Sequence, residues 1–229
     1  MKTQSFRFRG GIARVAAWHG RSDIASVALQ GRGALSTDAV EKLLDQLRAA
    51  GYREVITNAL APGASLPLVD SGFSIRGRLH LLSHDLESLP AATRRTRRAR
   101  SADSEALLQV DAEAFDDFWQ LDALGLHQAA RATPRSHTRV TREAPLAGYA
   151  LFGRADDVGY VQRLAIRPDA QGRGLGPALL GDGLRWLRAH NARSAFVNTQ
   201  VDNERALGLY ERAGFQLLPV GLCVFGRSL

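Results

Sequence analysis

The chain has 229 residues, enough for one large domain or two small ones with a sizeable core. Its hydrophobic fraction of 45% and charged fraction of 23% are typical of globular proteins, and no apolar run approaches the ~20 residues of a membrane-spanning helix. A single cysteine excludes an internal disulfide, and the N-terminus lacks the apolar stretch of a secretory signal. We therefore expect a cytoplasmic protein without membrane partners, in which Cys223 packs in a strand as a small hydrophobe.

The net charge of +7 raises the question of nucleic-acid binding. Only Lys2 and Lys42 are lysines, so arginine supplies nearly all of the positive charge. The densest cluster, at residues 94–100, has two interpretations: a patch for polyanions, or a solvated linker, which is the commoner role of charge runs. We favour the linker and do not expect nucleic acid as a partner, whereas a homodimer stays open.

The first part of the chain contains a helical pattern at residues 39–50 and a strand pattern at residues 55–57. Residues 65–73 end in Gly-Phe and resemble residues 208–215 near the C-terminus, with Leu68 in the place of Tyr210. This similarity indicates a degenerate copy of the later fold, with Gly31-Arg32-Gly33 as the one hint of a phosphate loop. An unrelated α/β segment is the alternative.

Pro90–Thr93, followed by the arginine cluster, is the predicted boundary between domains of residues 1–93 and 94–229. The second domain alternates helical and strand patterns. Helices are predicted over 105–115, 121–130, from about 177 and over 203–213, and strands over 138–141, 148–152, 159–166, 195–199, 215–217 and 222–225.

The most informative segment is residues 164–177, where Leu-Ala-Ile leads into Gln-Gly-Arg-Gly-Leu-Gly and a helical pattern follows. Glycines at a strand-to-helix turn let the backbone approach a ligand and aim several N–H groups at one point. With the positive end of a helix behind them, these groups favour phosphate. Pro177 suits the first helical turn. The spacing matches neither a Walker loop nor a dinucleotide fingerprint.

The order Gln-x-x-Gly-x-Gly after Leu-Ala-Ile resembles the acetyl-CoA loop of the GNAT superfamily of N-acetyltransferases. The later series Asn203-x-x-Ala206-x-x-x-Tyr210-x-x-x-Gly214-Phe215 is similar to the family as well. The resemblance covers roughly residues 95–229. It implies the GNAT fold, of α/β (α+β) class: a central mixed, mostly antiparallel sheet flanked by helices, here preceded by a smaller, partial GNAT-like repeat.

The resemblance also implies acetyl-CoA as cosubstrate, without a metal. In the family the strand before the loop carries a bulge and splays from its neighbour, and strand and loop together hold the cosubstrate. Asn203 is expected to bond the pantetheine and Tyr210 to protonate the departing thiolate; their spacing of seven places both on one helix face. The residues implied in binding by strand and loop are Leu164, Ala165, Ile166, Gln171, Gly172, Arg173, Gly174, Leu175, Gly176 and Pro177.

The general base is missing from its usual place in the family. Many members carry Glu shortly before the Leu-Ala-Ile equivalent, where this chain has Gln162 and Arg163, neither of which can act as a base. Water and a backbone carbonyl are one substitute. Side chains of the first two helices or of a loop are another, and each of them has a surface or capping role as its simpler explanation: Asp116, Asp117, His127 and His137. No base is assigned.

The sequence therefore predicts an N-acetyltransferase that moves the acetyl group of acetyl-CoA to a primary amine by direct attack. The acceptor is either a protein N-terminal amine or a small-molecule amine. Phe118 and Trp119, between the first two helices, form either an apolar wall for the acceptor or part of the core. The alternative function, suggested by the missing carboxylate, is a non-catalytic acyl-CoA-binding or interaction module.

Overall fold

A computed structural model describes residues 4–8, 11–18, 20–31, 35–64, 66–91 and 94–229. The chain divides into two compact units, unit 1 with Met1–His80 and Pro219–Leu229, and unit 2 with Leu81–Leu218. These units do not coincide with the predicted domains of 1–93 and 94–229. One reason is that a single strand, β5 (Ser74–His84), runs from unit 1 into unit 2; the other is that the C-terminal strand belongs to unit 1.

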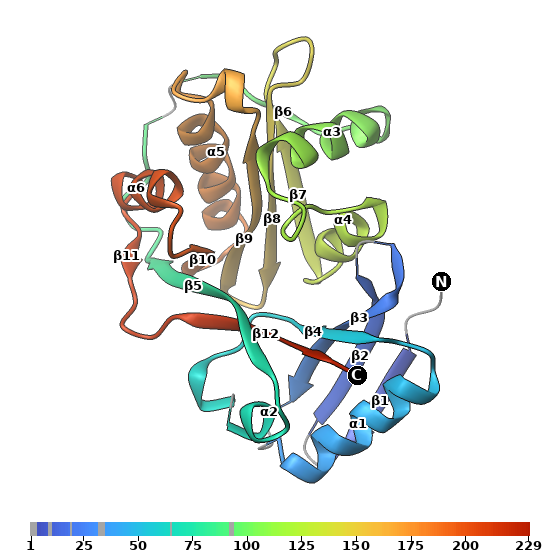
Figure 1. Cartoon of the computed structure of the whole chain (residues 1–229). Helices are drawn as coiled ribbons and strands as arrows, with labels where there is room; N and C mark the ends of the chain where they lie inside the picture. The colour runs from blue at the N-terminus through green and yellow to red at the C-terminus, as the bar shows by residue number, and fades with distance from the viewer. Residues whose placement is uncertain (1–3, 9–10, 19, 32–34, 65, 92–93) are drawn as a thin grey trace. The chain divides into compact units, whose positions relative to one another are not determined.

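Unit 1 is a sheet covered by a helix. Its strand order is β1-β2-β3-β4-β12-β5, and among its described residues the β3–β4 pair is parallel and the other pairs are antiparallel. Helix α1 (Thr37–Ala49) makes the crossover between β3 and β4 and lies against the sheet (Figure 1). Its apolar stripe, which includes Leu44 and Leu47, is buried with Phe225 and the half-buried Cys223 of β12, as predicted for that cysteine. The further elements are β1 (Gln4–Phe8), β2 (Gly11–Trp18), β3 (Arg21–Gly31), β4 (Glu54–Thr57), η1 (Pro62–Ala64), α2 (Leu66–Asp70) and β12 (Leu222–Ser228).

Unit 2 has the strand order β5-β10-β9-β8-β7-β6, with β11 paired to β5. Its strands are β6 (Arg97–Arg98), β7 (Arg135–Val140), β8 (Gly148–Ala155), β9 (Val158–Ile166), β10 (Ser194–Gln200) and β11 (Gln216–Leu217). Its helices are η2 (Ser101–Asp103), α3 (Ser104–Ala114), α4 (Ala123–Ala130), η3 (Pro168–Ala170), α5 (Leu175–Ala189) and α6 (Glu204–Arg212). Together with β12, these elements confirm the predicted order of strands and helices and the mixed, mostly antiparallel sheet.

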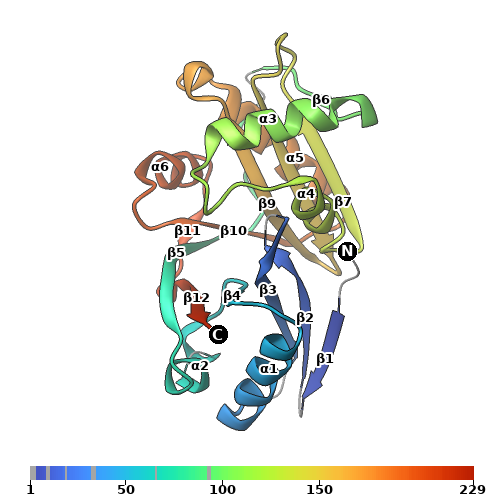
Figure 2. The same ribbon diagram turned by 45° about the vertical axis from the view of Figure 1, so that its right-hand side comes forward.

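The sheet of unit 2 is covered on both faces, with α3 and α4 on one and α5 on the other (Figure 2). Side chains of β8 alternate accordingly, because successive residues of a strand point to opposite faces. Tyr149 is buried with residues of α3, whereas Ala150 and Phe152 are buried with residues of α5. Helix α5 approaches the sheet closely at Gly183, where a Cβ would lie 1.9 Å from the Phe152 ring.

The two units repeat one order of elements: three strands, a helix, a strand parallel to the third, a second helix and a further strand. The end of the second helix is the same in both, with Phe73 N–H donating to the Leu68 carbonyl and Phe215 N–H to the Tyr210 carbonyl, each at 3.0 Å. The intervening glycines have φ of +75° and +96°. The partial repeat is thus confirmed; Arg32 and Gly33 of the suggested phosphate loop lie outside the described residues.

Strand β9 has the two irregularities that the family resemblance implies. Its register with β8 shifts between Leu151 and Phe152, which pair with Arg163 and Val161, so that Gln162 is the extra residue of a bulge. Its parallel pairing with β10 joins Val158–Tyr160 to Ser194–Phe196, and in the described part of the chain it goes no further. The remaining residues of β9 and β10 therefore form the two sides of an opening in the sheet.

Candidate functional site

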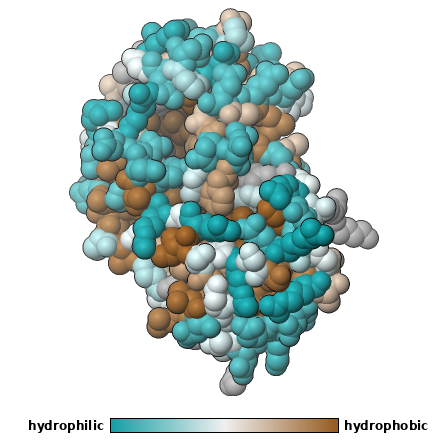
Figure 3. Space-filling view, in the orientation of Figure 1, coloured by the Kyte–Doolittle hydropathy of each residue, from teal (hydrophilic) through white to brown (hydrophobic). Residues whose placement is uncertain are grey.

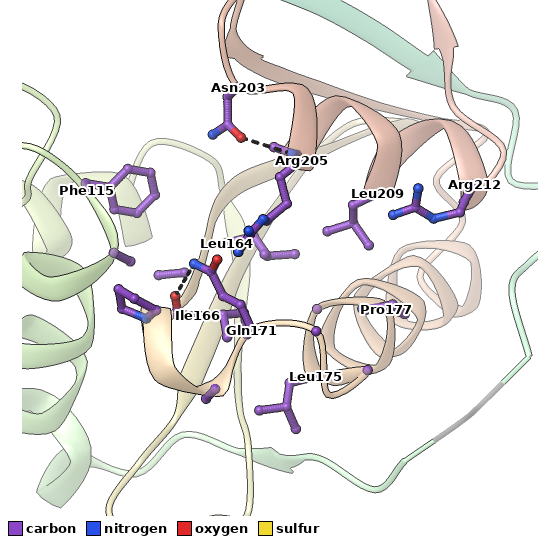
Figure 4. A pocket seen from close by; sticks show the side chains of 18 residues that line it. Phe115, Leu164, Ile166, Gln171, Leu175, Pro177, Asn203, Arg205, Leu209 and Arg212 are labelled. Atoms are coloured by element: carbon purple, nitrogen blue, oxygen red, sulfur yellow. Dashed lines mark hydrogen bonds between the residues drawn. The ribbon is translucent and has the colours of Figure 1, made fainter.

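A pocket of about 650 Å³ lies in unit 2 at the carboxyl end of β9. Its walls come from the end of α3, from Leu164–Ile166, from the loop that enters α5 and from α6. The space-filling view shows an apolar recess in this region, with hydrophilic residues around it (Figure 3). Figure 4 shows the side chains that line the pocket, among them Phe115 from the α3 end, Leu175 and Pro177 from α5, and Leu209 from α6. The volume is in the range of small-molecule sites.

Three glycines give the loop its form. Gly172 and Gly174 have φ of +77° and +78°, a conformation that other residues rarely adopt. Gly176 brings α5 close to α6, because a Cβ there would lie 3.3 Å from Leu209. Helix α5 begins at Leu175, and the first turn of a helix has N–H groups without intrahelical acceptors. The loop therefore presents backbone donors at the positive end of a 15-residue helix.

Two side chains of the loop donate to backbone carbonyls, one at the end of β9 and one within η3. Gln171 Nε2 donates to the Ile166 carbonyl at 3.1 Å, as Figure 4 shows. Arg173 Nη2 donates to the Asp169 carbonyl at 2.8 Å, and its residue is not among those that line the pocket. The predicted strand and loop residues otherwise all line it: Leu164, Ala165, Ile166, Gln171, Gly172, Gly174, Leu175, Gly176 and Pro177.

Helix α6 supplies the remaining wall. Asn203 lines the pocket and caps the helix, since its Oδ1 accepts the Ala206 N–H at 3.0 Å. Arg205 and Arg212 line the same pocket, two helical turns apart. No Asp or Glu occurs among the described residues that line it. The pocket is therefore positively charged.

Tyr210 is buried within α6, with an exposed fraction of 5%, and is not among the lining residues. Its ring packs edge to face on Phe215, with centroids 5.7 Å apart. Burial raises the pKa of the Tyr210 hydroxyl well above its ordinary value, and the nearby charge of Arg163 opposes this rise. Ala206 and Leu209, which precede Tyr210 by four residues and by one, do line the pocket.

None of the side chains considered as bases lines the pocket. Asp116 Oδ1 accepts the N–H groups of Phe118 and Trp119, a capping role. His137 stacks on Trp186, with ring centroids 4.9 Å apart. The Gln162 amide lies over Gly153, where a Cβ would meet it at 2.6 Å. Asp117 and His127, in the α3–α4 connection and in α4, are also absent from the lining residues, as are the half-buried Phe118 and Trp119.

Asp111, which is fully buried in α3, was missed in the sequence analysis. Its carboxylate accepts two hydrogen bonds from the Arg163 guanidinium, at 2.7 and 2.6 Å, and one from the Tyr149 hydroxyl at 2.6 Å. The Leu121 N–H donates a further one at 2.7 Å. An aspartate between Val110 and Ala112, on a helix with an apolar face, was the available signal, because a buried carboxylate needs partners.

Basic residues of the cluster at 94–100 have partners within unit 2. Arg97 forms an ion pair with Asp103 at 2.7 Å, and Arg94 lies 3.7 Å from Glu143. Among the described residues there is no group of three or more His, Cys, Asp or Glu side chains arranged to hold a metal ion. No helix within the described ranges is long and apolar enough to cross a membrane.

Residues 104–215 match the family model of the acetyltransferase (GNAT) family. The mycothiol acetyltransferase of Saccharomonospora viridis is 32% identical over 148 residues, which cover 56% of this chain and 47% of that protein. A candidate ribosomal protein bS18 alanine N-acetyltransferase of Bacillus subtilis is 25% identical over 120 residues, which cover 52% of this chain and 79% of that protein. The chain spans less than half the length of the mycothiol acetyltransferases that it matches.

Among solved structures, a tandem GNAT protein from the clavulanic acid biosynthesis pathway is similar over 96% of this chain and 79% of its own, with a TM-score of 0.69. Its sequence is 13% identical, so the similarity concerns the fold alone. That fold extends over both compact units.

Proposed function

Residues 104–215 of this chain are an acetyltransferase domain of the GNAT family, and we propose that the chain transfers the acetyl group of acetyl-CoA to a primary amine by direct attack. The observation that carries the proposal is the positively charged pocket at the end of β9, where β9 and β10 have separated. Such a pocket combines donors for phosphate with exposed strand edges for an extended arm. CoA has both a diphosphate and an extended pantetheine arm.

The diphosphate of CoA is assigned to the loop Gln171–Pro177. Backbone N–H groups at a helix N-terminus favour anions, and the positive φ of Gly172 and Gly174 is what lets the loop turn there. Arg205 and Arg212 add two positive charges without a carboxylate among the lining residues. Arg173, beside the pocket, is assigned to the same phosphates.

The pantetheine arm is assigned to Leu164, Ala165 and Ile166. Tyr160 is the last β9 residue that pairs with β10, so these three residues have no β10 partner. Their backbone groups on the side that faces β10 can therefore bond an extended ligand as a neighbouring strand would. Asn203 uses its Oδ1 for the helix cap, which leaves its amide N–H groups as donors to the arm. A backbone amide of β9 at the opening then polarises the thioester carbonyl.

In the proposed reaction the amine nitrogen bonds to the thioester carbonyl carbon, the carbon–sulfur bond breaks, and the nitrogen gives its extra proton to water. The sulfur takes the proton of the Tyr210 hydroxyl, and the phenolate then regains a proton from water. A phenol with its ordinary pKa already carries its proton at neutral pH, so the role needs no shift; the raised pKa of Tyr210 makes it a weaker acid while it is buried. No side chain is assigned as base, because the strand position that many family members give to Glu holds Gln162 and Arg163.

The acceptor is proposed to be a protein N-terminal amine or a small-molecule amine. The relatives support both: mycothiol acetyltransferases by name act on a small molecule, and the Bacillus subtilis relative by name acts on the alanine of a ribosomal protein. These relatives have in common that they acetylate a compound or protein with an amine.

Release of the free CoA thiol tests the proposal. The chain is mixed with acetyl-CoA and a panel of amines that includes short peptides with free N-termini and small amino thiols. We expect thiol release that depends on one class of amine. Binding of acetyl-CoA without release on any amine would instead support an acyl-CoA-binding module.

A further inference from the structure

A buried ion pair ties strand β9 to the segment that connects α3 and α4. We call it the Arg163 network; it consists of Arg163, Asp111, Tyr149 and the backbone of Trp119 and Leu121. The Arg163 side chain is 12% exposed and the Asp111 side chain 0%. A buried carboxylate with an arginine on both oxygens, a phenol and a backbone N–H has all its acceptor needs met. The network therefore holds β9 and α3 in a fixed position relative to each other.

Arg163 reaches the connecting segment directly. Its Nη2 donates to the Trp119 carbonyl at 2.7 Å as well as to Asp111. Its Cζ lies 3.5 Å from the centroid of the Phe115 ring, a cation–π contact. Phe115 in turn lines the pocket (Figure 4). One guanidinium thus fixes both a wall of the pocket and the chain that follows this wall.

The connection, residues 115–122, also has hydrogen bonds within α3 and the connection itself. Gln120 Nε2 donates to the Ala112 and Phe115 carbonyls, at 3.2 and 3.1 Å. Asp116 accepts the N–H groups of Phe118 and Trp119. These hydrogen bonds shape the segment. The Arg163 network adds hydrogen bonds that link it to strand β9.

The walls of the pocket that come from the loop and from α6 are built without this network. The loop is fastened by Gln171 to the Ile166 carbonyl and by Arg173 to the Asp169 carbonyl. The wall from α6 begins with the Asn203 cap. Loss of the network should therefore leave the loop and α6 in place and free only the connection.

We propose that Arg163 is a positioning residue for the acceptor side of the site. Through Asp111 and the Trp119 carbonyl it holds residues 115–122, with the Phe115 ring, beside the pocket, and this is the wall left for the acceptor amine because the walls from the loop, β9 and α6 are assigned to CoA. The kinetic part of the inference rests on the proposed acetyltransferase function; the structural part does not. Arg163 lies in the part of the strand where many family members have a Glu that acts as base. In this chain the residue there positions the segment that connects α3 and α4.

Arg163→Lys is the informative variant. Lysine retains the positive charge near Asp111 but lacks the planar fork that reaches both oxygens, the Trp119 carbonyl and the Phe115 ring at once. Hydrogen exchange of residues 115–122 should become ~10-fold faster or more, the effect of losing a charged hydrogen bond. Exchange in α5 should stay the same. The matched control is Arg139→Lys, a β7 arginine paired with Asp182 at 2.7 Å and remote from the connection.

Kinetics give the second readout. For Arg163→Lys we expect the KM for the amine to rise ~10-fold while the Kd of acetyl-CoA changes less than ~2-fold. If Arg163→Lys does not fold, Tyr149→Phe, which removes one bond to Asp111 and keeps the ion pair, should change the same quantities in the same direction.

The two readouts separate the two claims. If hydrogen exchange in residues 115–122 becomes faster in the variants but the unchanged chain releases no CoA, the acetyltransferase function is contradicted and the positioning role of Arg163 stands. Unchanged exchange in both variants would contradict the positioning role, whatever the activity. An equal loss of acetyl-CoA and amine affinity would also overturn it, because the network would then support the whole pocket.

Discussion

Tyr210 combines burial with a place on the helix that lines the pocket. Its pKa is raised, and its neighbours Ala206 and Leu209 line the cavity. For Tyr210→Phe we expect kcat to fall ~10²–10⁴-fold, the usual contribution of a general acid. The Kd of acetyl-CoA should change little, since the phenyl ring retains its packing on Phe215. Steady-state kinetics and titration calorimetry measure the two quantities.

An equal loss of turnover and affinity in Tyr210→Phe would assign the residue to structure rather than to proton transfer. The pH profile adds a check. Because the pKa of Tyr210 is raised, its proton stays in place throughout the neutral range and above. Activity should therefore rise with pH as the acceptor amine loses its proton, with no fall from Tyr210 near neutral pH.

Gly174 offers a second test at this scale. It precedes α5 with φ of +78°, and nothing lies within 4 Å of where a Cβ would be. Gly174→Ala should cost about 1 kcal/mol of folding free energy for its left-handed conformation. It should also weaken acetyl-CoA binding, because the loop relaxes away from this conformation.

Gly51, after α1, is the matched control: its φ is +87° and its surroundings are equally open. Gly51→Ala should reduce stability by a similar amount and leave acetyl-CoA affinity as it was. If both variants bind acetyl-CoA like the unchanged chain, the loop does not hold the phosphates.

At the scale of the element, helix α6 carries the positive wall of the pocket. Replacing Arg205 and Arg212 with glutamine removes two charges from a pocket without lining carboxylates. Each replacement should weaken acetyl-CoA binding ~5–10-fold at low salt, by the loss of a charged hydrogen bond, and less at high salt because of screening. Titration calorimetry at two ionic strengths measures both effects.

Arg188→Gln, at the exposed end of α5, is the control for net charge. If it lowers the affinity as much as the α6 variants do, the effect comes from the overall field of the protein and α6 makes no specific contact.

The elements of the second half were predictable because their signals are local. Gly172 and Gly174 require positive φ, and Asn203 caps the helix that it was expected to begin. Strands β1 to β3 escaped prediction; in β2 two of the three buried side chains are alanine, Ala13 and Ala17, so its hydrophobic pattern is weak. Asp111 and Arg163 are 52 positions apart, and only the packing of α3 on β9 brings them together. The burial of Tyr210 likewise depends on tertiary packing, in its case with Phe215 and residues of α5.

At the scale of the whole molecule, the C-terminal strand belongs to the unit formed by the start of the chain. Phe225 of β12 is 2% exposed within the core of unit 1. Phe225→Ala should cost about 3–5 kcal/mol, the usual range for a buried phenylalanine. Hydrogen exchange should become faster in α1 and β4 and stay nearly unchanged in α5. Equal acceleration in α5 would show that the two units unfold as one.

Stability should depend on pH through His137. Burial, and then the charge of Arg139, lowers the pKa of His137 to about 4 from an ordinary 6.5. The unfolded chain therefore binds this proton first, so the stabilising contribution is complete above pH 6.5 and is lost as pH falls toward 4. Because the ring is only half-buried and solvent screens its charge, we expect only about 1 kcal/mol between pH 7 and 5. His137→Phe, which can still stack on Trp186, should reduce the fall in melting temperature between pH 7 and pH 5. An unchanged fall would contradict the assignment of this pH dependence to His137.

Titration of the chain with acetyl-CoA by calorimetry tests the central claim most directly, because every proposed role depends on the pocket holding this molecule. We predict saturable binding with one site per chain, a Kd below ~1 mM as is usual for enzyme substrates, and weaker binding in Gly174→Ala. No heat of binding up to ~1 mM acetyl-CoA would contradict the account, since the pocket would then serve another ligand.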